Sequence, residues 1–222
     1  MSDLFNNSWN MFDNNYAEEY LHYFPKTLHN EAAKTIFNEL PLDKNISVLD
    51  VGCGNGQLLP LLLNNSADFE YTGIDFSVPL LRKAKEVFDA NKTKIKNSSE
   101  LIMGDVLDIN NYKKIYDISI AVHLVELVSS PELLLNILSK TSRYIALIWY
   151  EYPRIEHSKF EIKPYVNSYN EEQQINSPYL RSSYSSGYYN YMLQSNNLSL
   201  VKKIPEGFSD KNVLTIYKTN ID

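Results

Sequence analysis

A short apolar strand that runs directly into a glycine-rich loop constrains this chain more than any other feature. Residues 46–51 read Ile-Ser-Val-Leu-Asp-Val, and residues 52–56 read Gly-Cys-Gly-Asn-Gly. The apolar, β-branched run predicts a buried strand, because such residues fit a pleated, packed surface. Glycines directly after a strand let the backbone approach a ligand without a Cβ in the way. Residues 57–63 predict the start of a helix, so the local unit is strand, glycine loop and helix.

Strands and helices continue to alternate through the middle of the chain. Ser77 is expected to cap one helix and Ser130 to open another. The further strands are predicted at residues 69–74, 101–103, 116–122 and 144–149. This alternation predicts right-handed crossovers and a parallel sheet with helices on both faces. Two late strands, 198–203 and 213–218, have no helix between them, which predicts an antiparallel hairpin at one edge.

The segments on either side of the alternating core differ from it. Aromatic residues spaced by three and four predict a helix over residues 9–24, and Thr27 is expected to cap a second helix that ends before Pro41. Residues 151–180 hold prolines and many aromatics without a clear period, and we interpret them as an insertion over the carboxyl edge of the sheet. A chain of 222 residues favours one domain with an elaboration. Its expected parts are residues 1–41, 42–150, 151–182 and 183–222.

Composition excludes several classes of protein. With 44% hydrophobic and 22% charged residues, the chain can form a full core and is not wholly disordered. A formal charge of −6 argues against broad electrostatic binding to nucleic acid or to an anionic membrane. One cysteine allows neither a disulfide framework nor a cysteine zinc site, and we identify no metal site. Since residues 1–10 do not resemble a secretory signal, we expect a cytoplasmic protein.

Acidic residues follow the second and third predicted strands. Asp75 ends one and Asp105 follows the other. Ligands of open parallel sheets bind outside the carboxyl ends of the strands, so both carboxylates are expected near the glycine loop. Alone, each feature has a plain structural explanation, such as a tight turn or a helix cap. Together they indicate a nucleotide-like ligand, with Asp75 accepting from ribose hydroxyls and Asp105 from a base amino group.

Four segments resemble the motifs of the class I S-adenosylmethionine-dependent methyltransferases, in particular those of the small-molecule type. The segments are Val48–Gly56, Tyr71–Ser77, Gly104–Val106 and Tyr116–Ile120. The resemblance spans roughly residues 46–150 and implies a Rossmann-like, doubly wound α/β/α fold. The late hairpin would complete its seven-stranded, mostly parallel sheet. The resemblance further implies S-adenosylmethionine as cofactor and S-adenosylhomocysteine as product.

The resemblance also implies roles for individual residues. Asp50 would help to position the cofactor's ammonium group, Phe76 would lie against adenine, and the aromatic helix over residues 9–24 would act as a lid. The implied cofactor contacts are Tyr16, Tyr20, Asp50, Gly52, Cys53, Gly54, Asn55, Gly56, Asp75, Phe76, Gly104, Asp105, Val106, Ala121, Val122 and His123.

Two other functions stay open at this point. A nicotinamide dehydrogenase also has a glycine loop, but its G-x-G-x-x-G pattern fails because position 57 is Gln. A catalytically silent S-adenosylmethionine-binding partner or scaffold is harder to exclude, because binding motifs say nothing about turnover.

The methyl acceptor is the least determined part of the prediction. A hydroxyl acceptor generally needs a base and an amine must be unprotonated. His123, at the end of the fourth strand, and His157, in the insertion, are the candidate catalytic groups; because of them we favour O-methylation over N-methylation. The candidate substrate contacts are Tyr150, Glu151, Arg154, His157 and Tyr188. We expect a small molecule such as a metabolite, a sugar intermediate or a modified peptide end, and a monomer or homodimer.

Overall fold

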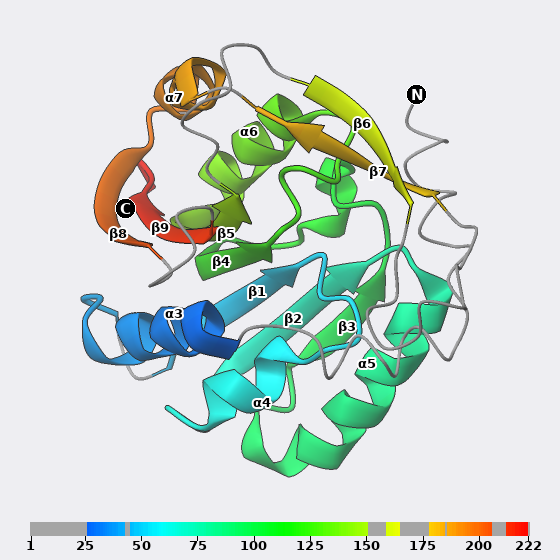
Figure 1. Ribbon diagram of the computed structural model, residues 1–222. Coiled ribbons are helices and arrows are strands. Elements are labelled where there is room, and N and C mark those ends of the chain that lie inside the picture. Colours follow the sequence, from blue (N-terminus) through cyan, green and yellow to red (C-terminus); the bar gives the residue numbers. More distant parts are fainter. Residues whose placement is uncertain are drawn as a thin grey trace.

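The computed structural model describes residues 26–42, 45–150, 159–164, 178–184, 186–205 and 212–221 (Figure 1). The helix predicted over residues 9–24 lies outside these ranges. The helices are α3 (Lys26–Asn38), α4 (Leu58–Leu63), α5 (Val78–Asn91), α6 (Pro131–Thr141) and α7 (Ser186–Ser195). The strands of the main sheet are β1 (Ser47–Val51), β2 (Glu70–Asp75), β3 (Glu100–Met103), β4 (Tyr116–Val122), β5 (Ser142–Tyr150), β8 (Ser199–Pro205) and β9 (Asn212–Lys218).

The main sheet has seven strands in the order β3-β2-β1-β4-β5-β9-β8. The neighbouring pairs from β3 to β5 are parallel, and β9 pairs antiparallel with both β5 and β8. The predicted mostly parallel sheet with an antiparallel edge hairpin is therefore confirmed. The chain moves from β1 outward to β3 and then returns to place β4 on the other side of β1. Such a reversal of strand order opens a crevice at the carboxyl ends of the strands.

Helices cover both faces of this sheet, as Figure 1 shows. On one face α3, α4 and α5 pack over alternate residues of the central strands, including Val48 and Ile118. On the other face α6 and α7 cover the intervening residues, including Leu49 and Ile145. Strand residues that alternate between two apolar layers are buried on both sides, which is typical of parallel sheets. The three-layer α/β/α prediction is confirmed.

The insertion differs from its prediction. Residues 159–164 and 178–183 form a separate antiparallel sheet of two strands, β6 (Lys159–Pro164) and β7 (Pro178–Ser183). The sequence Lys-Phe-Glu-Ile-Lys does alternate polar and apolar residues, the period of a strand, so the signal was present but short.

Two helix starts also differ in detail. Thr27 lies inside α3, which begins at Lys26, so its predicted capping role is wrong. Ser77 is the N-cap residue of α5, but its side chain makes no capping hydrogen bond. Pro79 lies in the first turn of that helix, where a missing N–H costs nothing. In the described part of the chain, every helix is too short or too polar to cross a membrane.

Candidate functional site

The glycine loop after β1 takes a backbone conformation that glycine alone adopts easily. Gly52, Gly54 and Gly56 have φ angles of +69°, +54° and +78°. The backbone N–H of Gly52 and of Cys53 both donate to the Ile74 carbonyl, at 2.8 and 3.0 Å, which ties the loop to the end of β2. A Cβ at Gly56 would lie 3.0 Å from the Ala84 Cα of α5. These glycines therefore let the loop sit tightly between the sheet and α5.

Asp75 holds the loop in place from the end of β2. Its Oδ2 accepts from the Gly54 N–H and its Oδ1 accepts from the Ser77 N–H, both at 2.8 Å. The side chain is buried, and burial raises its pKa while these backbone donors lower it. A carboxylate offers about four lone-pair sites, so these backbone donors do not exhaust its capacity to accept from a ligand.

Asp50 is a second buried carboxylate and the next-to-last residue of β1, just before the glycine loop. It is 2% exposed, and its Oδ2 accepts from the Tyr71 hydroxyl at 2.7 Å. Burial raises the pKa of Asp50 to about 7, the Tyr71 hydrogen bond opposes that rise, and the charge of Asp75 adds to it. Asp50 is thus a carboxyl group whose charge is costly in the absence of a cation.

The third acidic segment is held by side chains from its own loop. Asp105 Oδ1 accepts from the Leu107 N–H at 2.9 Å, and Asn111 Nδ2 donates to the Asp105 carbonyl at 2.8 Å. The Tyr112 hydroxyl donates to the Val106 carbonyl at 2.7 Å. These hydrogen bonds hold the loop that carries Asp105 and Val106, and both residues line the crevice.

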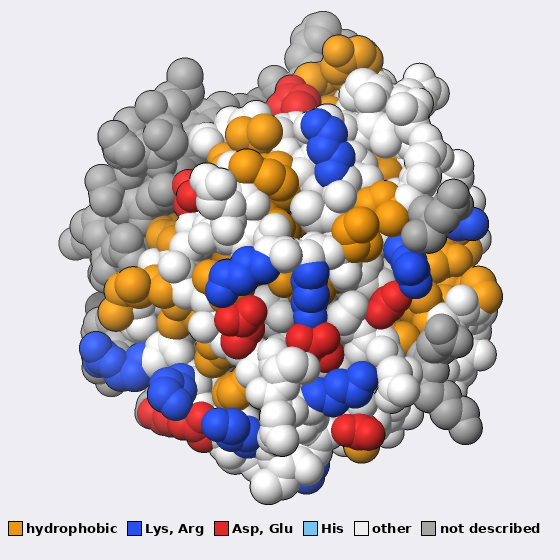
Figure 2. Space-filling model, turned by 180° about the vertical axis from the view of Figure 1, so that it is seen from behind, with side chains coloured by type: hydrophobic (Ala, Val, Ile, Leu, Met, Phe, Trp, Pro, Cys, Tyr) orange, Lys and Arg blue, Asp and Glu red, His pale blue; other side chains and the backbone are white. Residues whose placement is uncertain are grey.

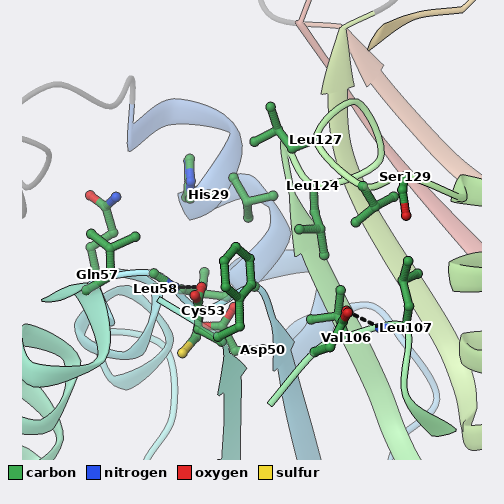
Figure 3. A pocket seen from close by; sticks show the side chains of 18 residues that line it. His29, Asp50, Cys53, Gln57, Leu58, Val106, Leu107, Leu124, Leu127 and Ser129 are labelled. Atoms are coloured by element: carbon green, nitrogen blue, oxygen red, sulfur yellow. Dashed lines mark hydrogen bonds between the residues drawn. The ribbon is translucent and has the colours of Figure 1, made fainter. Parts of the chain in front are cut away.

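These segments line one cavity of about 910 Å³, open to solvent, at the carboxyl ends of β1, β2 and β4 (Figure 3). A Cβ at Gly52 would lie 2.8 Å from Leu124 Cδ1, so glycine at this position lets the Leu124 side chain pack closely against the loop. The lining consists of His29, Asp50, Gly52, Cys53, Gly54, Gln57, Leu58, Asp75, Phe76, Leu80, Asp105, Val106, Leu107, Val122, Leu124, Leu127, Val128 and Ser129.

Nine of the residues singled out from the sequence line this cavity: Asp50, Gly52, Cys53, Gly54, Asp75, Phe76, Asp105, Val106 and Val122. The others in the described ranges are not among its lining residues: Asn55, Gly56, Gly104, Ala121, His123, Tyr150 and Tyr188. Tyr16, Tyr20, Glu151, Arg154 and His157 lie outside the described residues.

His123 occupies a special backbone position beside the cavity. Its φ angle is +49°, uncommon for a residue other than glycine, and its N–H donates to the Ile148 carbonyl at 2.7 Å. The imidazole is buried and stacks on the Tyr150 ring, with centroids 4.4 Å apart. Glu126, also buried, accepts from the Tyr150 N–H at 2.6 Å. Together these contacts join the ends of β4 and β5, and His123 is not among the described residues that line the cavity.

Sequence reasoning missed nine of the lining residues, four of which are Gln57, Leu58, Leu80 and Leu107. His29 projects from α3 toward the cavity and is 3% exposed (Figure 3). The turn after β4 contributes Leu124, Leu127, Val128 and Ser129. The turn could have been found from its place at a strand end, whereas nothing in the sequence marks His29, since its approach depends on how α3 packs. The described residues contain no group of three or more His, Cys, Asp or Glu that could hold a metal ion.

Comparison with known proteins identifies relatives on several levels. Residues 42–197 match the model of a methyltransferase domain family. A 70-residue segment is 34% identical to trans-aconitate 2-methyltransferase of Rhodopseudomonas palustris, covering 32% of this chain and 27% of that protein. An 85-residue segment is 29% identical to tRNA (guanine-N(7)-)-methyltransferase of Metamycoplasma hominis, covering 37% of this chain and 40% of that protein. The matched segments thus span less than half of either curated relative.

Solved structures share the fold over most of the chain. The CcbJ methyltransferase of Streptomyces caelestis matches with a TM-score of 0.68 at 14% identity, over 88% of this chain and 90% of that one. An S-adenosylmethionine-dependent methyltransferase of Clostridium acetobutylicum matches with a TM-score of 0.65 at 13% identity, over 91% and 98%. At this low identity, the similar structures show a shared fold only. The family assignment rests on the match of residues 42–197 to the family model. The chain belongs to the methyltransferase domain family, among the S-adenosylmethionine-dependent class I methyltransferases.

Proposed function

We propose that this chain binds S-adenosylmethionine in the strand-end cavity and transfers its methyl group to a small molecule that carries no negative charge. The proposal rests on the convergence of three carboxylates and the glycine loop on one cavity. S-adenosylmethionine is the cofactor of the family. When bound, it supplies an electrophilic methyl group on a sulfonium sulfur.

The residues present fit this cofactor by chemistry. Asp75 keeps lone pairs free for ribose hydroxyls while it holds the Gly54 N–H. Asp105 would accept from the adenine amino group, with Phe76 against the ring. Asp50 would face the ammonium group, and the bare backbone of Gly52 and Gly54 in the cavity lining would lie against the methionine portion.

His29 is the group that we propose for the cofactor's carboxylate. Among the lining residues that the structure describes, it is the one side chain able to carry a positive charge, and three others are carboxylates. An imidazole N–H donates to an anion in either protonation state. Tyr16 and Tyr20, predicted for the same part of the cofactor, remain predictions.

A ligand without the carboxylate tests this role. Calorimetry would compare S-adenosylhomocysteine with its decarboxylated analogue on the wild type and on His29→Ala. We expect the variant to bind S-adenosylhomocysteine about tenfold more weakly, as for loss of one hydrogen bond to a charged group, and the analogue equally well. Equal weakening of both ligands would refute a contact to the carboxylate.

Charge in the cavity favours an uncharged acceptor. The described lining holds Asp50, Asp75 and Asp105 but neither Lys nor Arg. Leu124, Leu127 and Val128 form an apolar wall on which a neutral molecule can pack. An acceptor with several carboxylates would be repelled by like charges at short range.

His123 was one of the two reasons for favouring oxygen as the accepting atom. His123 was expected beside the methyl group, but its ring stacks on Tyr150 outside the cavity lining. His157, Glu151 and Arg154 remain predicted contacts in the insertion. We therefore propose transfer to an oxygen or a nitrogen without preference, with proximity supplying most of the acceleration.

A nucleic-acid acceptor has less support, although one relative acts on tRNA. The formal charge is −6, and Figure 2 shows a face on which Lys and Arg lie next to Asp and Glu. Lys83 pairs with Glu86, Lys85 with Asp89, and Lys113 with Glu100. Cations neutralised by neighbouring acids contribute little to phosphate binding.

One experiment tests the function as a whole. Purified protein is incubated with S-adenosylmethionine labelled in the methyl group and with a cell extract separated into small molecules, protein and RNA. We expect label in the neutral small-molecule fraction, and mass analysis would then identify the acceptor. Cofactor binding without transfer to any fraction would favour the silent partner or scaffold instead. Label confined to RNA or to di- and tricarboxylates would refute the proposed acceptor class.

A further inference from the structure

We propose that Tyr71 is a positioning residue that orients the Asp50 carboxylate toward the cavity and keeps it ionised for a cationic part of the ligand. The inference rests on the proposed binding of S-adenosylmethionine and adds a residue of β2 that does not itself line the cavity. Tyr71 is buried in the layer under α3 and α4, and its hydroxyl donates to Asp50 Oδ2 at 2.7 Å.

The register of the sheet explains how a tyrosine reaches Asp50. Asp50 pairs with Gly73 in the parallel β1–β2 ladder, and Tyr71 lies two residues before Gly73 on the same face. A Cβ at Gly73 would lie 3.2 Å from the Tyr71 hydroxyl oxygen and 3.1 Å from Cys53 Sγ. The missing side chain at Gly73 therefore creates the passage through which the tyrosine ring extends to the carboxylate.

Because of the hydrogen bond, the two carboxylate oxygens of Asp50 have different partners. Tyr71 takes up Oδ2, which leaves Oδ1 to accept from a ligand in the cavity that Asp50 lines. Burial raises the pKa of the Tyr71 hydroxyl far above its ordinary value, so it remains a donor at every working pH. A permanent donor on one oxygen fixes the rotation of the carboxyl group.

The surroundings of Asp50 make this donor important. Among the residues that the structure describes, the titratable groups around it are Tyr71 and Asp75 of β2 and Cys53 of the loop, and His29 of α3 lines the same cavity. Burial and Asp75 both favour the neutral form of Asp50, and Tyr71 favours the charged form. Without Tyr71, the carboxyl would be neutral over a wider pH range and could not neutralise an ammonium group.

Calorimetric titration with S-adenosylhomocysteine between pH 6 and 8.5 tests the inference. In the wild type we expect affinity to rise with pH around 7, where Asp50 ionises. In Tyr71→Phe the midpoint should move up by about one pH unit, which makes binding at pH 7 about tenfold weaker. The loss should shrink toward pH 8.5. Titration of the ligand's own ammonium is common to all variants, so the comparison between variants isolates Asp50.

Two further variants separate positioning from simple loss of packing. Asp50→Asn should bind weakly and lose the pH step that is assigned to Asp50. Tyr112→Phe removes a matched buried hydroxyl, the one that donates to the Val106 carbonyl, and should leave the pH midpoint where it is. A midpoint for Tyr71→Phe equal to that of the wild type would overturn the inference. Failure of the wild type to bind at all would instead overturn the proposed function.

A measurement on the unmodified protein covers the case in which Tyr71→Phe does not fold. Carboxyl and tyrosine ¹³C resonances of the wild type can be followed from pH 4 to 9. We expect the Asp50 carboxyl and the Tyr71 ring carbon that bears the hydroxyl to change together near pH 7. A Tyr71 signal that does not follow the Asp50 titration would overturn the inference.

Discussion

Replacing Asp50 by Asn should make the ligand-free protein less sensitive to alkaline pH. Asp50 has a pKa of about 7 in the folded protein, against 3.8 as the ordinary value. Below about pH 4 the group is protonated in both folded and unfolded chains and contributes no difference. As pH rises toward 7 the unfolded chain ionises first, so stability is lost. Above pH 7 the loss is complete and amounts to about 4 kcal/mol, at 1.36 kcal/mol per pKa unit.

The variant keeps the local structure while removing the ionisation. An Asn side-chain oxygen can accept from the Tyr71 hydroxyl as Asp50 does. Its buried NH₂ group adds a penalty of about 1–3 kcal/mol that does not depend on pH. The informative quantity is therefore the slope. Between pH 5 and 8 the wild type should lose about 2–3 kcal/mol more stability than Asp50→Asn.

Urea unfolding followed by circular dichroism at pH 5, 6, 7 and 8 measures this slope. Asp89→Asn, which changes a surface carboxylate paired with Lys85, is the control and should follow the wild type. If the free energies of unfolding of the wild type and of Asp50→Asn changed with pH in parallel, burial would not raise the pKa of Asp50 as argued. Saturating S-adenosylhomocysteine should restore part of the wild type's stability at pH 8, since a ligand that binds only the folded state stabilises it.

Three further changes test other parts of the site. Asp75→Ala removes the acceptor for two backbone N–H groups. S-adenosylhomocysteine affinity, measured by calorimetry, should fall at least tenfold, because hydrogen bonds to charged groups are lost. Unchanged affinity would contradict a contact between Asp75 and the ligand. Gly56→Ala meets a φ of +78° and the Ala84 backbone, so unfolding experiments should show a loss of about 1–3 kcal/mol; a neutral substitution would mean that the loop moves freely. His123→Asn keeps a residue that tolerates the left-handed backbone. Its cofactor affinity by calorimetry should stay within threefold of the wild type, and its turnover within tenfold. A hundredfold loss of turnover would instead support His123 as a catalytic base.

The sequence alone was sufficient for the alternating α/β core. The β-branched runs and the glycine loop are local signals, and each predicted strand from β1 to β5 occurs with ends shifted by at most two residues. Strand-end carboxylates were equally predictable, because parallel strands bring their carboxyl ends to one edge. For this reason Asp50, Asp75, Phe76 and Asp105 all line the cavity.

Only the tertiary structure decided which way side chains turn at that edge. His123 follows a strand that borders the site, yet it has a positive φ, stacks on Tyr150 and is not among the described lining residues. His29 lies in a helix with no motif, and the packing of α3 brings it into the lining. Tyr71 pairs with Asp50 because the register sets Gly73 beside Asp50. Local patterns determine elements and their order, whereas orientation depends on contacts between residues far apart in the chain.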